Sequence, residues 1–123
     1  MKRILFISIL FAFAFSALLI AADAPTTAPN NYKTVFENER VRVFDVTVKP
    51  GDKIPSHSHP DHLAYPLNSC TLALTAEGGK AQAAEAKPGQ VLWSNAVTHS
   101  VENAGKTECK LIIVELKESA PKK

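Results

Sequence analysis

The chain has 123 residues and a formal net charge of +2, with 14 Lys and Arg against 12 Asp and Glu. This length is enough for one small domain, and a nearly neutral charge without a basic stripe argues against nucleic acid as a partner. The two cysteines are far apart in the sequence, which excludes a zinc ribbon and a redox Cys-x-x-Cys motif.

The N-terminus has the pattern of a secretory signal peptide over residues 1–22. Lys2 and Arg3 precede an uncharged apolar run over 4–22, and Ala22-Asp23-Ala24 has the small-x-small form of a cleavage site. We therefore expect cleavage near 22–24 and a periplasmic or secreted protein that keeps no membrane contact. The alternative is an uncleaved anchor, because a run of about 19 apolar residues can just span a bilayer.

The segments that flank the predicted domain are poor in apolar residues. Residues 23–31 are rich in Pro, Thr and Asn, which predicts a flexible lead-in. Residues 119–123 close the chain with small and basic side chains, and we expect this tail to fray. The folded domain is therefore expected over 32–118.

Four segments have the patterns typical of strands. Residues 41–48 and 109–116 alternate, 71–76 stops at a Gly-Gly turn signal, and 80–86 lies between that turn and a Pro-Gly. Alanine would also favour a helix over 80–86, but the segment is too short to nucleate one alone. Strands that recur about every 8–12 residues predict an antiparallel, all-β sandwich or barrel.

Three of the four histidines fall within the stretch HSHPDH. On a strand, His57 and His59 face the same side, and two neutral imidazoles in that arrangement suit one transition-metal ion. Pro60 cannot donate to a sheet ladder, so a turn there brings His62 into phase with them. His99 starts another predicted strand. The alternative to a metal site is a set of solvated or structural histidines.

The sequence around the first three histidines resembles the first motif of a small single-domain cupin. In that family a Gly is followed after five residues by His-x-His, and then by a Glu. Here five residues separate Gly51 from His57, and His59 completes the His-x-His pair. His62 occupies the position of the family's Glu.

A second stretch, KPGQVLWSNAVTHSVENAG, resembles the second cupin motif. Gly89, His99 and Asn103 fall on family positions, whereas Asn95 and Val97 stand where Pro and Gly are usual. Because valine does not easily adopt the positive φ that a glycine allows, the loop before His99 should differ from that of relatives. The two motifs and the strand before them span roughly 35–116.

The resemblance implies a cupin double-stranded β-helix, an antiparallel jelly-roll barrel. It also implies one divalent transition metal (Fe, Mn, Ni, Cu or Zn) held by His57, His59, His62 and His99. Since His62 replaces an acidic ligand, the metal keeps its full positive charge, which favours an anionic substrate.

Cupins with such sites include dioxygenases, so the resemblance implies a metal-dependent small-molecule enzyme of oxygenase type. The alternative is a non-catalytic metal-binding or ligand-binding cupin. Tyr65 and Glu102 are the nearest candidates for a general base, although each fits a surface or packing role. Four residues are candidate apolar walls of a substrate pocket, or plain core: Trp93, Leu72, Leu74 and Val101.

The strand that starts at His62 is apolar on both faces, which predicts a homodimer, and the resemblance implies the same; the alternative is that the N-terminal strand covers this surface. In the jelly roll that the resemblance implies, this strand lies beside the last strand. Cys70 would close the first of the two and Cys109 would open the second. In an exported protein they could form a disulfide; the alternative is a buried pair of free thiols.

Overall fold

The computed structural model describes residues 22–118. The predicted signal peptide, apart from Ala22, and the predicted tail at 119–123 lie outside the described residues. Within the described range, no helix combines the length and hydrophobicity needed to cross a membrane.

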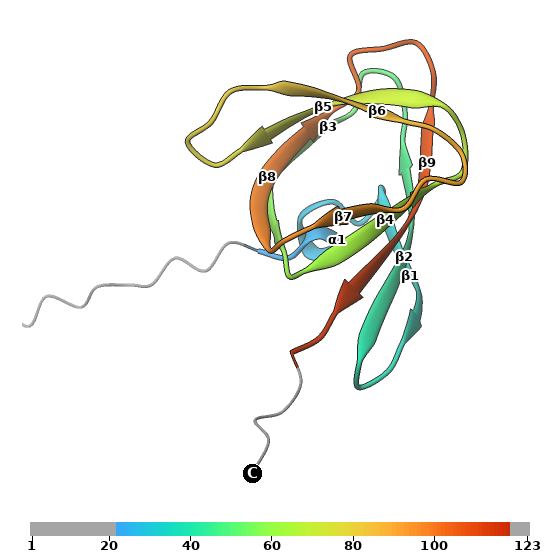
Figure 1. Ribbon diagram of the computed structural model, residues 1–123. Coiled ribbons are helices and arrows are strands. Elements are labelled where there is room, and N and C mark those ends of the chain that lie inside the picture. Colours follow the sequence, from blue (N-terminus) through green and yellow to red (C-terminus); the bar gives the residue numbers. More distant parts are fainter. Residues whose placement is uncertain (1–21, 119–123) are drawn as a thin grey trace, which may run out of the picture.

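The described residues form one short helix and nine strands (Figure 1). In chain order these are α1 (Ala24–Thr27), β1 (Tyr32–Glu37), β2 (Val41–Val48), β3 (Lys53–His59), β4 (His62–Pro66), β5 (Cys70–Ala76), β6 (Gln82–Ala86), β7 (Leu92–Ser94), β8 (Val97–Glu102) and β9 (Cys109–Leu116). They build a five-stranded sheet in the order β1-β2-β9-β4-β7 and a four-stranded sheet in the order β3-β8-β5-β6. Every pairing between these strands is antiparallel, so the all-β prediction is confirmed.

The strands β2 and β9 are neighbours inside the five-stranded sheet. They pair along their whole length, from Val41 opposite Leu116 to Val48 opposite Cys109. Successive side chains of a strand point to opposite faces, and the inward stripe of β2 carries the fully buried Phe44. The core between the sheets is made of such stripes: Phe44, Val46, Val48, Ile54, Leu72, Val101, Leu111 and Ile113.

Residues 23–31, for which the composition predicts a flexible lead-in, contain the short helix α1. Asp23 caps α1 by accepting a hydrogen bond from the Thr26 backbone N–H at 3.2 Å, as N-cap carboxylates do. Ala24 is fully buried, and Ala28 is buried as well. The segment is held by burial of small side chains, which a low apolar content does not reveal.

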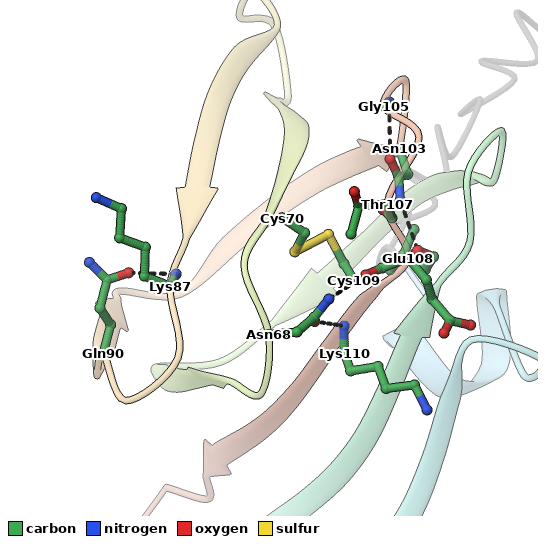
Figure 2. The surroundings of a disulfide bond; sticks show 11 residues. Asn68, Cys70, Lys87, Gln90, Asn103, Gly105, Thr107, Glu108, Cys109 and Lys110 are labelled. Carbon is green, nitrogen blue, oxygen red and sulfur yellow. Dashed lines mark hydrogen bonds between the residues drawn. A yellow bond between two sulfur atoms is a disulfide. The ribbon is translucent and has the colours of Figure 1, made fainter.

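Cys70 and Cys109 form a disulfide (Figure 2). The sequence places Cys70 at the end of the strand that starts at His62, but that strand, β4, ends at Pro66 and does pair with β9. Cys70 instead opens β5, so the bond ties the four-stranded sheet to β9 of the five-stranded sheet. The Asn68 side chain braces the same end through hydrogen bonds to the backbone on both sides of Cys109.

Asn103 fixes the turn between β8 and β9. Its amide nitrogen donates to the carbonyl oxygens of Val48 at 2.9 Å and Thr107 at 2.8 Å, and its side-chain oxygen accepts from the Gly105 N–H at 3.1 Å. The Asn103 backbone carbonyl accepts from the N–H of Gly51, which has a φ of +87°. These two residues of the histidine motifs therefore stabilise turns and lie outside the histidine cluster.

Candidate metal centre

His57, His59 and His99 lie together on two paired strands. His57 and His59 are two residues apart on β3 and face the same side, and His57 is directly opposite His99 on β8. One nitrogen of each ring lies within 4.8 Å of one from each of the others. His57 is 0% exposed and His59 is 3% exposed. Three imidazoles so close together and shielded from water can hold one metal ion.

His62 joins the cluster from the opposite sheet. β3 ends at His59 and β4 begins at His62, so Pro60 and Asp61 carry the chain from the four-stranded to the five-stranded sheet. His62 is 5% exposed and its ring centroid lies 4.7 Å from that of His59. It is not a member of the group whose nitrogens lie within 4.8 Å of one another.

Asp61 links the two histidine motifs. Its carboxylate accepts a hydrogen bond from the Ala96 N–H at 2.7 Å, in the loop just before β8. Its backbone carbonyl accepts from the N–H of Leu116 at 2.9 Å. No residue other than glycine has a positive φ within the described chain, so the loop before His99 is held by Asp61 and needs no glycine at Val97.

The proton positions of two histidines follow from their partners. His57 Nδ1 lies 2.7 Å from the carbonyl oxygen of Pro55, and His62 Nδ1 lies 2.8 Å from that of Pro60. A carbonyl oxygen only accepts, so each Nδ1 carries the hydrogen and each Nε2 keeps its lone pair. The repeated Pro-x-His pattern thus prepares both rings to bind a metal through Nε2.

Burial keeps these rings neutral, as metal ligands must be. Removal from water lowers the pKa of His57 and of His62 below the ordinary value, because a charged imidazole is poorly solvated there. Burial, and then repulsion from the neighbouring histidines, lowers the pKa of His99 to about 3.

Glu115, which the sequence did not single out, is a buried neighbour of the histidines. It is 1% exposed, and its Oε2 accepts a hydrogen bond from His59 Nδ1 at 2.7 Å. Its Oε1 accepts from two nitrogens of Arg42, at 3.1 and 2.8 Å. Burial alone would raise the pKa of Glu115, but the hydrogen bonds from His59 and Arg42 bring it below the ordinary value.

Tyr32 also borders the histidines, in place of the two general-base candidates from the sequence. Its hydroxyl lies 3.4 Å from His57 Nε2, and the residue is 5% exposed. Tyr65 is 40% exposed, and Glu102 forms an ion pair with Lys53 at 3.7 Å in which both side chains are exposed. Burial raises the pKa of the Tyr32 hydroxyl, which keeps it a hydrogen-bond donor.

The donor set fits a transition-metal ion. His99 Nε2 is buried and has no hydrogen-bond partner. Among the side-chain nitrogens and oxygens of residues 22–118, it is the only buried atom without one. Buried polar atoms are nearly always paired, so a nitrogen left open beside two other imidazoles points to a ligand. An imidazole set of this kind suits Fe, Ni, Cu or Zn.

Two cavities adjoin the histidines. An inner cavity of about 110 Å³ is bordered by His59, His62 and His99 and is otherwise mostly apolar, with three of the predicted wall residues, Leu72, Leu74 and Val101, in its lining. An outer cavity of about 490 Å³ is bordered by His62 and His99, and also by Trp93, the fourth predicted wall residue. Trp93 is 55% exposed, so it belongs to the mouth and not to the interior.

The family described as Cupin_2, cupin domain, matches residues 44–115. No curated protein is significantly similar to the chain.

Several solved structures share the fold. A cupin domain from Bordetella pertussis Tohama I is 26% identical, with a TM-score of 0.65, and the match covers 71% of this chain and 92% of that one. An RmlC-like cupin family protein with a double-stranded β-helix fold, from Methanocaldococcus jannaschii, is 15% identical with a TM-score of 0.57, covering 69% and 77%. A cupin superfamily protein from Desulfitobacterium hafniense DCB-2 is 18% identical with a TM-score of 0.55, covering 71% and 76%.

Proposed function

The chain belongs to the cupin domain family, and from this premise we propose that it is a metal-dependent small-molecule enzyme of oxygenase type. The observation that carries the proposal is the buried, unpaired Nε2 of His99 beside His57 and His59. Oxygenase chemistry needs a redox-active ion, which selects Fe, Mn, Ni or Cu from the metals that the resemblance implies.

We propose His62 as the fourth ligand. Its ring lies against that of His59, and its Nδ1 is engaged by Pro60, which leaves Nε2 free. It also borders both cavities. Four neutral ligands leave the charge of the ion uncompensated, since the carboxylate of Glu115 is paired with Arg42. A small anionic substrate would therefore bind well at this site.

The protein's own residues would prepare the site for such a substrate. A bound metal would supply Lewis acidity and a binding position for oxygen. The apolar lining of the inner cavity excludes water, which strengthens electrostatic contacts with an anion. Tyr32 borders the inner cavity, and its hydroxyl could donate a hydrogen bond to the substrate. Lys80 at the outer cavity adds a positive charge that attracts an anion toward the mouth.

A second candidate function is a non-catalytic cupin that binds a metal or a small ligand. The observation that favours it is the absence, within residues 22–118, of a free buried carboxylate near the histidines. Glu115 is the buried carboxylate there, and both of its oxygens are engaged. A reaction that needs a general base would have to take it from the substrate or from metal-bound water.

Metal analysis and oxygen consumption distinguish these functions. Protein purified without a histidine tag should carry about one redox-active ion per chain. With that ion bound, it should consume oxygen in an electrode cell when small anionic substrates are screened. One zinc or copper ion per chain without oxygen uptake for any substrate would favour the non-catalytic binder. Protein that stays metal-free after incubation with each ion would refute both functions as metal-dependent ones.

We also propose that the protein is a homodimer. The exposed large hydrophobic side chains of the described chain all lie on or beside strands of the five-stranded sheet: Val35, Phe36, Tyr65, Leu67, Val91, Leu92, Trp93 and Leu116. The four-stranded sheet has none of them. Concentration on one sheet favours a second copy as the partner.

Light scattering tests the dimer. Size-exclusion chromatography with light scattering should give twice the mass of the mature chain. Phe36→Asp should shift the protein toward the monomer, because it places a charge on the apolar sheet. Lys33→Asp on the same strand is the matched control and should leave the mass unchanged. A wild-type mass equal to one chain would refute the dimer.

A further inference from the structure

A continuous series of polar contacts runs from His59 to the start of the described chain. Glu115 lies on the inward stripe of β9, directly opposite Arg42 on β2. One carboxylate oxygen of Glu115 accepts from His59 Nδ1 at 2.7 Å, and the other accepts from Arg42 at 2.8 Å. The Arg42 guanidinium also reaches the Asp23 carboxylate at 2.8 Å. Four residues from three strands and the N-terminal segment are thus joined in order.

Each member of this series is buried or has a further contact. The side chain of His59 is 1% exposed and that of Glu115 is 2% exposed. The Arg42 guanidinium lies 4.9 Å from the centre of the Phe44 ring, so it packs against the core. Asp23 caps α1 and forms a bridge with Ser58 on β3, next to His59. Charge-assisted hydrogen bonds of this length are strong and directional.

His59 is the one ring among His57, His59 and His62 that lacks a local acceptor. Each of the other two bonds the carbonyl of the proline two residues earlier. The acceptor for His59 comes instead from β9, in the opposite sheet. The orientation of this ring therefore depends on Glu115, which is distant in sequence. A substitution can remove the Glu115 carboxylate without changing the backbone near the histidines.

We propose that Glu115 is a positioning residue of the metal centre, which fixes His59 as the Nδ1-protonated tautomer, and that Arg42 and Asp23 hold Glu115 in place. The proposal rests on the proposed metal binding. A carboxylate that bonds the far nitrogen of a ligating histidine sets the orientation of the ring and makes it a better ligand. With both oxygens engaged, Glu115 acts through His59 and does not itself bind the ion.

The first measurement uses metal-free wild-type protein. Long-range ¹H–¹⁵N correlation spectra of the imidazoles should show His59 protonated at Nδ1 and unprotonated at Nε2. Glu115→Gln keeps the shape of the side chain but removes its charge, and its amide can turn its nitrogen toward His59. We expect this variant to contain a mixture of His59 tautomers. A wild-type His59 protonated at Nε2 would overturn the proposal.

The second measurement is metal affinity. Glu115→Gln should bind the same number of ions at saturation, with an affinity about 10–100-fold lower. Asp23→Asn, at the exposed end of the series, should produce a smaller loss. Glu37→Gln is the matched control, because it removes a carboxylate paired with Lys117 at 2.8 Å on the same sheet, and it should leave the affinity unchanged. Wild-type affinity in both Glu115→Gln and Asp23→Asn would contradict the proposal.

The outcomes separate this inference from the proposed function. If the wild type binds no metal, the function fails, while the tautomer of His59 in metal-free protein still decides whether Glu115 positions it. If Glu115→Gln does not fold, the wild-type spectrum and the metal affinity of Asp23→Asn decide whether Glu115 positions His59. If a Co²⁺-loaded Glu115→Gln protein has a spectrum with one ligand fewer, Glu115 is a ligand and the positioning role is wrong.

Discussion

Replacing His59 by alanine should leave the protein without stoichiometric metal. His59 lies between His57 and His62, with ring centroids 4.9 and 4.7 Å away, and 5.2 Å from that of His99. Its loss therefore removes the central ligand. Elemental analysis of tag-free protein should fall from about one ion per chain to none. Wild-type protein should also be stabilised by about 2.7 kcal/mol at an ion concentration of 100 times Kd, and the variant should not respond.

The comparison with His62→Ala tests the number of ligands. This variant keeps the three histidines on β3 and β8, so it should still bind one ion, with a weaker affinity. Because each variant is measured with and without added metal, its loss of stability in the metal-free state cancels. One tightly bound ion in His59→Ala would refute the ligand assignment. An unchanged metal affinity in His62→Ala would show that His62 is not a ligand and that three histidines hold the ion.

Removing the disulfide should lower the free energy of unfolding by about 4 kcal/mol. Cys70 and Cys109 are 39 residues apart in sequence, and in the chain-entropy description a crosslink of this span restricts the unfolded chain by that amount. The domain is small, so this is a large part of its stability. Urea unfolding of Cys70→Ala/Cys109→Ala should show the loss, and wild type in reductant should show a similar one. Equal midpoints in the oxidised and reduced wild type would contradict the expectation.

We propose that the protein is exported to an oxidising compartment, where this bond would form. The predicted signal peptide and the disulfide both support the proposal. Protein recovered from the periplasm of an expressing bacterium, unfolded without reductant, should then resist alkylation at both cysteines. Its mass should match cleavage after Ala22, which keeps Asp23 in the mature chain. Protein found only in the cytoplasm, as a full-length chain with two labelled thiols, would refute export.

The strands with regular alternation could be predicted from the sequence, and the irregular elements could not. The strands at 41–48 and 109–116 were predicted with the bounds that the structure gives. β1 was missed because Tyr32 is its one buried residue, so it has no alternating stripe. α1 was missed because its four residues include a proline and its burial depends on alanine.

The cluster of histidines could be predicted, and the residues that support it could not. Local spacing reveals His57, His59 and His62, since all three lie within six residues. The pairing of Glu115 with Arg42 depends on how two distant strands align. One signal was present: both charged residues fall in phase with the inward, apolar positions of their strands. A charge at such a position needs a buried partner, so this pattern predicts that Glu115 and Arg42 pair with buried groups of opposite charge.

The division of the centre between the two sheets has a consequence for how an ion could enter or leave. His57, His59 and His99 all belong to the four-stranded sheet, whereas His62 and Glu115 belong to the five-stranded sheet. The disulfide starts at Cys109, at the opposite end of β9 from Glu115. At the histidine end, Pro60 and Asp61 join His59 directly to His62, so the chain links the two sheets there as well. Because the sheets are held together at both ends, an ion would enter or leave through the outer cavity that His62 and His99 border.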